Sequence, residues 1–322
     1  MGIIGEVEMG SHRMEVGLLL RKAILTSSLL FSAEAWSAVT DAEIHRLEQV
    51  DTALLKSLVQ GHSKTAVIFH HLETGTLKLR HILMKNRLLY HHHIVSRDDT
   101  ETIKKIYNKQ KQGYIKGDWY ELLLKDFKFI GIELNESEIK MTGKQQYKKK
   151  IKELINKAAF IEYSKEKSDK FKLNQLQYKK LQLQPYLAKS GLSNKEINLL
   201  YSLQSRSHPA KSNYKKIHNN HLLCIFGCLN EENQQHIFES CQPLRDQLVL
   251  REGVKINDIY GDLSHQKLAI SSFIQIEEKR LEKIEDASAL LQVDPFPVDT
   301  VAGHILPGGL SARTRAEQVP DL

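Results

Sequence analysis

Apolar residues recur every three or four positions along most of this chain, which is the spacing of one face of an α-helix. The clearest case is residues 40–60, where five apolar side chains share a face: Ile44, Leu47, Leu54, Leu55 and Leu58. Thr40 stands three residues before Glu43, and this pair has the pattern of a capping box, in which each side chain bonds the backbone N–H of the other residue. The pattern predicts a helix that begins after Thr40.

The same periodicity predicts helices over most of the remaining chain, with glycine or a polar cap at their ends. A short helix and a longer one are expected on either side of Gly75, and Ser193 or Asn194 can cap another. Further helices are expected within residues 98–113, 118–131 and 263–284. The alternation of a half-buried strand never extends beyond a few residues, and only the residues around Cys224 suggest a short hairpin.

Charge is unevenly distributed along the 322 residues, whose formal net charge is +7. Residues 140–189 hold fourteen lysines and four acidic residues, so the rest of the chain is slightly acidic. This excess favours an anionic partner, either a nucleic acid or a membrane surface. Tyrosine and phenylalanine are spread through the same segment, and aromatic rings among lysines can stack on bases.

The lysine-rich segment has two interpretations. Its lysines form a solvated helical face while the aromatic rings turn to the core, or they contact phosphates. The run YKKKIKEL has lysines on all sides of a helix, more than an amphipathic helix requires, and this favours phosphate contact. The candidate nucleic-acid-binding residues are Lys144, Lys148, Lys149, Lys150, Lys152, Lys179 and Lys180.

All three cysteines of the chain lie within eighteen residues, together with one histidine. The order is Cys224, Cys228, His236 and Cys241, so two close ligands are followed by a loop and two more. This spacing lets a short segment wrap a tetrahedral ion, and thiolates with a neutral imidazole suit Zn²⁺. Four protein ligands leave no open position, so we predict a structural Zn²⁺ site. The alternative is three free buried cysteines and a surface histidine.

The cysteine count also bears on the compartment. Three cysteines are too few, and odd in number, for a secreted disulfide framework, so a reducing, intracellular compartment (cytoplasmic or nuclear) is expected. Arg21 and Lys22 precede an apolar run that is similar to a signal peptide, but polar residues interrupt it, and an amphipathic helix is the better interpretation. No apolar stretch of about 18 residues lacks charges, so we expect no membrane association.

Two polar clusters invite other interpretations. His91, His92 and His93 are consecutive, and helical neighbours point about 100° apart, so they cannot share one metal ion. We expect a solvated helix end there. Asp98 and Asp99 are the only adjacent aspartates in the chain, and we interpret them as acidic residues at the start of a helix.

Several motifs occur in an order that is typical of one protein family. LFSAEAW spans Leu30–Trp36, RLEQVDTALL spans Arg46–Leu55, HSKT spans His62–Thr65, and the cysteine–histidine cluster follows downstream. In this order they resemble the C-terminal, post-palm region of LINE-type (non-LTR) retrotransposon reverse transcriptases. The resemblance covers roughly residues 1–285. It implies a region that binds RNA or DNA beside the palm domain of a parent polyprotein.

The resemblance and the composition together divide the chain into five segments. Residues 1–95 are expected to form a helical thumb- or connection-like region, 96–220 a basic helical region, 221–245 a CCHC zinc knuckle, 246–285 a C-terminal helix, and 286–322 a disordered tail. The tail is rich in proline and glycine and lacks helical periodicity. The predicted fold class is therefore mainly α: a bundle-like helical region followed by a small zinc knuckle and a disordered tail.

The chain departs from the family's pattern at the catalytic site. The family's polymerase needs an apolar–Ala–Asp–Asp hairpin and a further palm aspartate to hold two metal ions, and this sequence supplies neither. RNA-directed DNA synthesis is the activity of the parent enzymes, and we expect this chain alone to bind nucleic acid without polymerising nucleotides. The alternative class is a zinc-stabilised helical adaptor whose basic face binds an acidic protein partner.

Overall fold

The computed structural model describes residues 13–37, 39–62, 64–113, 117–188, 191–214, 222–248 and 254–291. These parts of the chain are mainly helical and contain no strand, which confirms the predicted fold class at this level. Two isolated β-bridges occur within them, Thr74 with Leu183 and Leu223 with Glu231. The second bridge closes the short hairpin that the sequence suggests around Cys224.

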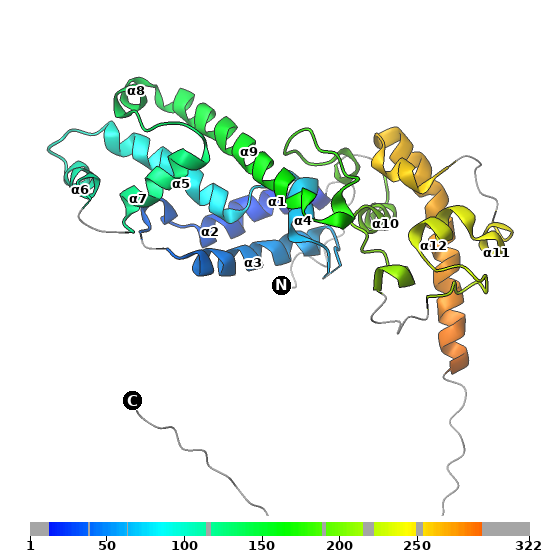
Figure 1. Ribbon diagram of the computed structural model, residues 1–322. Coiled ribbons are helices and arrows are strands. Elements are labelled where there is room, and N and C mark those ends of the chain that lie inside the picture. Colours follow the sequence, from blue (N-terminus) through cyan, green and yellow to red (C-terminus); the bar gives the residue numbers. More distant parts are fainter. Residues whose placement is uncertain are drawn as a thin grey trace, which may run out of the picture.

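Figure 1 shows the arrangement of the helices. They are α1 (Arg13–Leu20), α2 (Ser27–Leu29), α3 (Asp41–Leu58), α4 (Val67–Thr74), α5 (Leu79–Val95), α6 (Thr102–Lys111), α7 (Trp119–Phe129), α8 (Glu136–Met141), α9 (Lys144–Ser168), α10 (Asn194–Gln204), α11 (Gln242–Arg245) and α12 (Leu263–Leu291). Shorter 3-10 turns are η3 (Ala33–Ala35), η4 (Phe171–Leu173), η5 (Pro185–Leu187), η6 (Lys211–Tyr214) and η8 (Ile256–Tyr260). Two turns are π-helical, η2 (Arg21–Thr26) and η7 (His236–Ser240).

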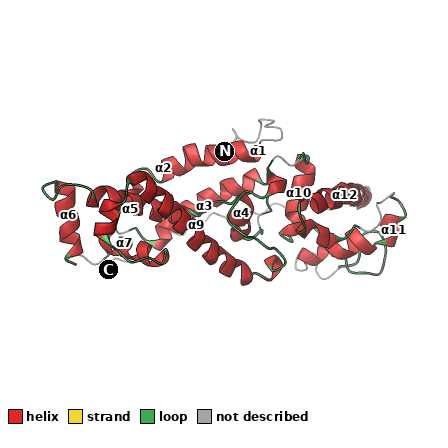
Figure 2. Ribbon diagram, turned by 90° about the horizontal axis from the view of Figure 1, so that it is seen from above, coloured by secondary structure: helices red, strands yellow, loops and turns green. Residues whose placement is uncertain are grey.

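The molecule is elongated. Figure 1 shows α6, α7 and α8 at one end and α11 and α12 at the other, with the long helices α5 and α9 packed together on the α6 side. The view from above in Figure 2 shows the same order along the long axis. Three apolar cores occur among the described residues: a small one around Ala33 and Leu83, and two larger ones that lie along this axis and share α9.

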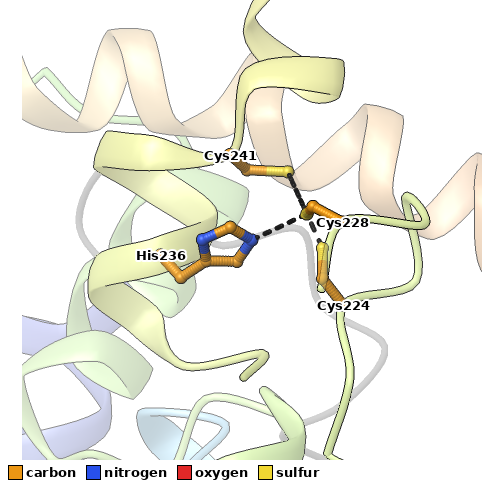
Figure 3. A group of neighbouring side chains, drawn as sticks. All are labelled: Cys224, Cys228, His236 and Cys241. Carbon is orange, nitrogen blue, oxygen red and sulfur yellow. Dashed lines mark hydrogen bonds between the residues drawn. The ribbon is translucent and has the colours of Figure 1, made fainter. Parts of the chain in front are cut away.

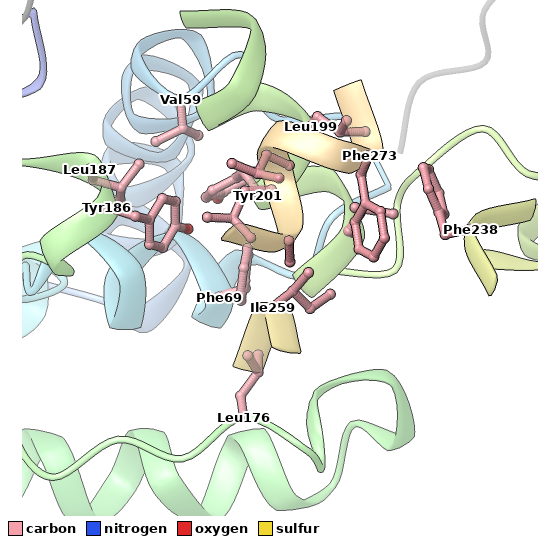
Figure 4. Packing of buried hydrophobic residues seen from close by; sticks show 14 of the residues in the cluster. Val59, Phe69, Leu176, Tyr186, Leu187, Leu199, Tyr201, Phe238, Ile259 and Phe273 are labelled. Carbon is pink, nitrogen blue, oxygen red and sulfur yellow. The ribbon is translucent and has the colours of Figure 1, made fainter. Parts of the chain in front are cut away.

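The first of the larger cores, called the α5 core, joins α5, α6, α7, α8 and the first half of α9 around Leu88, Phe127 and Ile151. The second core, called the α12 core, joins α4, the second half of α9, α10, η7, η8 and α12 (Figure 4). Its buried side chains include Phe69, Tyr201, Phe238, Ile259 and Phe273.

Helix α9 reaches both cores because its buried side chains recur every fourth residue. Tyr147, Ile151 and Ile155 belong to the α5 core, whereas Ala159 and Tyr163 belong to the α12 core. Residues four apart lie on one side of a helix, but each step of four turns the row by about 40°. The buried row therefore winds around α9 as it passes from one core to the other, and we call it the buried row of α9.

Helix boundaries agree closely with the predicted caps. The Oγ1 atom of Thr40 accepts a hydrogen bond from the Glu43 N–H, and the Glu43 carboxylate accepts one from the Thr40 N–H at 2.8 Å. Of the two candidate caps before α10, Ser193 is the one used, and it forms a capping box with Glu196. Helix α4 ends at Gly75, which has a left-handed φ of +64°.

The predicted start of the tail is wrong by a few residues. Helix α12 extends to Leu291, so residues 286–291 are helical and do not belong to a tail. The rest of the predicted tail, residues 292–322, lies outside the described residues.

The three consecutive histidines do not form a solvated helix end, and that prediction is wrong for two of them. The α5 helix is surrounded by α6, α7, α8 and α9, so His91 and His92 are buried and only His93 is exposed. His91 Nε2 lies 3.0 Å from the Tyr107 hydroxyl, and His92 Nε2 lies 2.8 Å from the carbonyl oxygen of Thr142. Their partners differ, as expected for neighbours that point in different directions.

A buried ion pair fixes the N-terminal helices. The Arg21 guanidinium donates two hydrogen bonds of 2.6 Å to the Asp51 carboxylate and a third of 3.0 Å to the carbonyl oxygen of Leu77. Both charged groups are buried, and each compensates the charge of the other. Asp98 lies in a turn before α6, where its carboxylate accepts a hydrogen bond from the Thr100 N–H at 3.2 Å.

Within the described ranges, every helix is too short or too polar to cross a lipid bilayer.

Candidate metal centre and basic surface

The first two cysteines lie on a hairpin turn. The Cys224 N–H donates to the carbonyl oxygen of Asn230 at 3.0 Å, and the Gly227 N–H donates to the carbonyl oxygen of Cys224 at 3.1 Å. Gly227 has φ +81°, a left-handed conformation that glycine adopts without a steric penalty. The turn therefore folds back tightly and brings the thiols of Cys224 and Cys228 to the same side.

The second pair of residues lies on a π-helical turn. His236 begins η7 and Cys241 follows its last residue, and the wider π-helical turn brings residues five apart close together. The side chain of Asn233 accepts a hydrogen bond of 2.8 Å from the His236 N–H and so fixes the start of this turn. On the imidazole, Nδ1 lies 3.3 Å from the hydroxyl of Ser240, which leaves Nε2 to face the cysteines.

The four side chains converge as the sequence predicts (Figure 3). The Cys241 Sγ atom lies 3.7 Å from Cys224 Sγ and 3.7 Å from Cys228 Sγ, and Cys228 Sγ lies 3.0 Å from His236 Nε2. One donor atom from each residue lies within 4.8 Å of all the others. Since a disulfide bond measures about 2.05 Å, these sulfur atoms are not bonded to one another. The group can hold one metal ion.

Burial acts on the protonation of three of these donors. It raises the pKa of the Cys224 and Cys241 thiols, and the neighbouring Cys228 thiol raises both further. It also lowers the pKa of His236, so the imidazole is neutral at neutral pH, the state required of a metal ligand. A cation would draw the protons from the thiols, because thiolate is the form that binds metal. Four protein donors then fill a tetrahedral shell.

The cluster is built into the α12 core. Cys224, Cys241, Ile237 and Phe238 are buried there, and the Phe238 ring packs against Phe273 of α12 with centroids 4.9 Å apart (Figure 4). The hairpin is also tied to α12 by charge. Glu232 is fully buried, accepts a hydrogen bond from the Ile225 N–H at 3.1 Å and lies 2.8 Å from the Arg280 guanidinium.

The predicted phosphate-binding lysines fall into separate groups on the structure. Lys144, Lys148 and Lys152 are exposed and follow one another at intervals of four, so they lie along one side of α9. Lys148 and Lys152 each stand one position after a residue of the buried row, which places them at the edge where α9 meets its neighbours. We call these three residues the lysine stripe.

Two further lysines that the sequence reading missed gather beside the lysine stripe. Lys85 of α5 is half-buried, and its pKa is lowered by burial and then by the charges of Lys22, Lys152 and Lys148. These side chains come from η2, α5 and α9. Neither Lys22 nor Lys85 lies in a lysine-rich segment, so the sequence does not indicate that they lie near the lysine stripe. Their proximity results from the packing of α5 against α9.

The remaining candidate lysines do not join the stripe. Lys150 lies on the opposite edge of α9, where its ammonium is 2.8 Å from the Glu138 carboxylate. Lys149 stands two positions, or about 200°, after Tyr147 and so points directly away from the core. Lys179 and Lys180 are exposed in the loop that follows α9, shortly before Leu183 pairs with Thr74 of α4.

The expectation that the aromatic rings of this segment stack on bases is wrong for several of them. Tyr147, Tyr163 and Tyr186 are buried, because they supply the apolar contacts of the two cores. The alternative reading, in which these rings turn inward, describes them correctly. Phe171 differs from them, since 78% of it is exposed.

The chain matches no protein-family model, no curated protein and no solved structure.

Proposed function

We propose that this chain binds nucleic acid, as the post-palm region of a LINE-type reverse transcriptase would, and that it carries one structural Zn²⁺. The proposal rests on the motif order in the sequence together with the lysine stripe. The palm aspartates are missing from the sequence, so the proposed role is binding and not polymerisation.

The observation that carries this proposal is the arrangement of like charges along α9. Lysines four residues apart repel one another and destabilise a helix by a few tenths of a kcal/mol per pair. Lys144, Lys148 and Lys152 make two such pairs, and Lys85 and Lys22 add to the repulsion. A phosphate backbone alongside this surface would replace the repulsion with attraction and release counterions.

The choice of Zn²⁺ rests on the donor set and on its spacing. Sulfur atoms that bind one Zn²⁺ at about 2.3 Å in a tetrahedron lie about 3.8 Å apart. The distances of 3.7 Å from Cys241 Sγ to each of the other sulfur atoms agree with this value. Three thiolates and an imidazole also favour Zn²⁺ over Mg²⁺ or Ca²⁺, which prefer oxygen ligands. With all four positions filled by protein, the ion would hold the hairpin and η7 together.

The binding proposal is tested by a charge reversal with a matched control. The test variant is Lys144→Glu, Lys148→Glu and Lys152→Glu, and the control is Lys149→Glu, Lys157→Glu and Lys165→Glu. The control residues are exposed, lie on the same helix and each stand two positions after a buried-row residue, so they form the opposite row. Both variants change the net charge equally, and only the first removes the lysine stripe.

The measurement is the Kd for a labelled oligonucleotide as a function of salt. Loss of three phosphate contacts should lower the log–log salt slope by about 2 to 3 and weaken binding to all sequences alike. The control should keep most of the affinity. Equal losses in both variants would assign the binding to net charge alone. Binding of an acidic protein that polynucleotide cannot displace would favour the adaptor.

A further inference from the structure

An exposed aromatic ring lies beside an arginine in the α12 half of the molecule. Phe171 begins η4, the turn directly after α9, and Leu173 of the same turn is buried. The turn is therefore anchored, yet the Phe171 ring is 78% exposed. The guanidinium carbon of Arg206 lies over this ring, 5.5 Å from its centroid. A ring and a guanidinium plane in this arrangement can both stack on a nucleobase.

The backbone of Arg206 is unusual for a residue with a side chain. It has φ +50°, immediately after the cap of α10. The Ser207 N–H donates to the carbonyl oxygen of Ser202 at 2.9 Å, and the Arg206 N–H donates to that of Leu203 at 3.1 Å. These two bonds define a Schellman ending, in which glycine usually takes the left-handed position. Glycine would end the helix at a lower conformational cost, so the presence of arginine indicates that its side chain has a role other than helix termination.

The Arg206 side chain lies at a small polar cleft of about 250 Å³. Six residues of its lining carry side-chain amides: Gln175, Asn213, Asn233, Gln234, Gln235 and Asn257. The described residues that line it include no carboxylate. Each amide offers both donors and an acceptor, as the edge of a nucleobase does, and an uncharged lining suits an uncharged heterocycle. We call this site the amide cleft.

Cations gather at the mouth of the amide cleft. The Nη2 atom of Arg206 donates to Gln175 at 3.2 Å, and Lys172 Nζ donates to the backbone carbonyl of Arg206 at 3.4 Å. The pKa of Lys172 is lowered by burial and then by the charges of Arg206 and Lys64. Three cations from three segments therefore lie near one another, beside a cleft without acidic groups.

We propose that the amide cleft binds an unpaired base of single-stranded nucleic acid. The base stacks on Phe171 and Arg206, its polar edge meets the amides, and the adjoining phosphate lies near Lys172. The inference rests on the proposed nucleic-acid binding and adds to it a preference for single strands. In a duplex the bases are already paired and stacked, so their faces cannot reach Phe171.

The amide cleft is also linked to the metal centre. Asn233 lines the cleft, and its Oδ1 atom accepts the hydrogen bond from the His236 N–H that fixes the start of η7. Gln234 and Gln235, which also line the cleft, stand between Asn233 and the metal-ligating His236. An ordered metal centre therefore holds one wall of the cleft in place.

The experiment uses the full chain and a labelled oligonucleotide of about 12 nucleotides, within the range of known single-strand site sizes. The same sequence is measured as a single strand and as a duplex by fluorescence anisotropy. Phe171→Leu should weaken single-strand binding roughly tenfold and leave duplex binding unchanged, since stacking on aromatic rings accounts for effects of that size. Phe171→Trp should restore the affinity, and the new indole fluorescence should be quenched on binding.

Arg206→Gly separates binding from folding. Glycine suits the left-handed position, so the thermal midpoint should stay the same or rise while single-strand affinity falls. Unchanged single-strand affinity in both Phe171→Leu and Arg206→Gly would overturn the cleft proposal, and the lysine-stripe variant would still report phosphate binding. Equal weakening of single strand and duplex would also overturn it. Absence of any binding by the unaltered chain would overturn the proposed function itself.

Discussion

The Nη2 atom of Arg280 lies 2.8 Å from Oε1 of Glu232, and both side chains are almost completely buried. Arg280 belongs to α12, whereas Glu232 belongs to the hairpin that carries two of the candidate metal ligands. Arg280 also donates to the carbonyl oxygen of Pro209 at 3.0 Å and lies 3.3 Å from the Glu277 carboxylate. One guanidinium therefore holds three segments of the α12 core together.

Removal of this guanidinium should strongly destabilise the α12 core. Arg280→Ala leaves the buried Glu232 with only the Lys211 ammonium, 3.8 Å away, in place of a direct contact. Breaking a buried pair costs about 3 to 5 kcal/mol when no cation remains, so a loss toward the lower end of that range is expected. Urea unfolding followed by circular dichroism measures the loss. Lys279→Ala is the neighbouring control, because Lys279 pairs with Glu282 on the exposed face of α12 and its loss should barely shift the midpoint. Similar shifts in both variants would contradict the role given to Arg280.

Loss of one ligand of the proposed Zn²⁺ should release the ion and loosen only part of the molecule. Cys228→Ser should lower the zinc content from about one per chain to none, since a hydroxyl is a poor ligand for Zn²⁺. Hydrogen exchange should then increase in η7 and the hairpin, while α5 and the first half of α9 keep their protection, because they pack in the other core. Leu229→Ser is the control, since Leu229 is adjacent and exposed. A fully protected hairpin without metal would contradict the structural role.

Glu73 should make stability depend on pH. Burial raises the pKa of this carboxyl to about 7, although hydrogen bonds from Tyr178 and Tyr186 act to lower it. The unfolded chain loses this proton near pH 4.5 and the folded chain near pH 7. The buried carboxyl thus stabilises the fold below about pH 4.5, and this contribution is lost as the pH rises to 7, by about 3 kcal/mol in total.

Glu73→Gln removes the titrating group and keeps its shape. The free energy of unfolding of the unaltered chain should fall relative to that of the glutamine variant between pH 4.5 and 8. Denaturant unfolding at several pH values measures the difference, and His70 and the tyrosines around Glu73 remain in both chains. A difference that stays constant with pH would mean that the pKa of Glu73 is the same in the folded and the unfolded chain.

Gly75 should not tolerate a side chain. Its φ is +64°, and a Cβ atom there would lie 2.2 Å from the backbone carbonyl carbon of Gln182. Gly75→Ala should therefore cost about 2 to 4 kcal/mol from the left-handed backbone and the overlap together. Gly113 has φ +78° with nothing within 4 Å of a Cβ, so Gly113→Ala should cost only about 1 kcal/mol. Comparable losses in both variants would rule out the close approach of the loop around Gln182.

The features predicted correctly from the sequence are local ones. A capping box or a helical period needs only a few consecutive residues, and the four candidate metal ligands lie within eighteen residues, so their spacing alone predicted that they come together. The burial of His91 was missed because it depends on α6 and α7, which pack over α5 from later in the chain. Lys85 and Arg206 were missed for the same reason, since their neighbours are distant in sequence.

The winding buried row of α9 gives that helix a further property. Because Tyr147 is fixed in one core and Tyr163 in the other, the two halves of the molecule cannot hinge independently without breaking a continuous helix. From Lys148 to Ser168 this helix measures about 30 Å, at 1.5 Å per residue. The lysine stripe lies at one end of this length, and Phe171 follows the other. Helix α9 thus fixes the distance between the lysine stripe and Phe171. An oligonucleotide that contacts both must span about 30 Å, whatever its sequence.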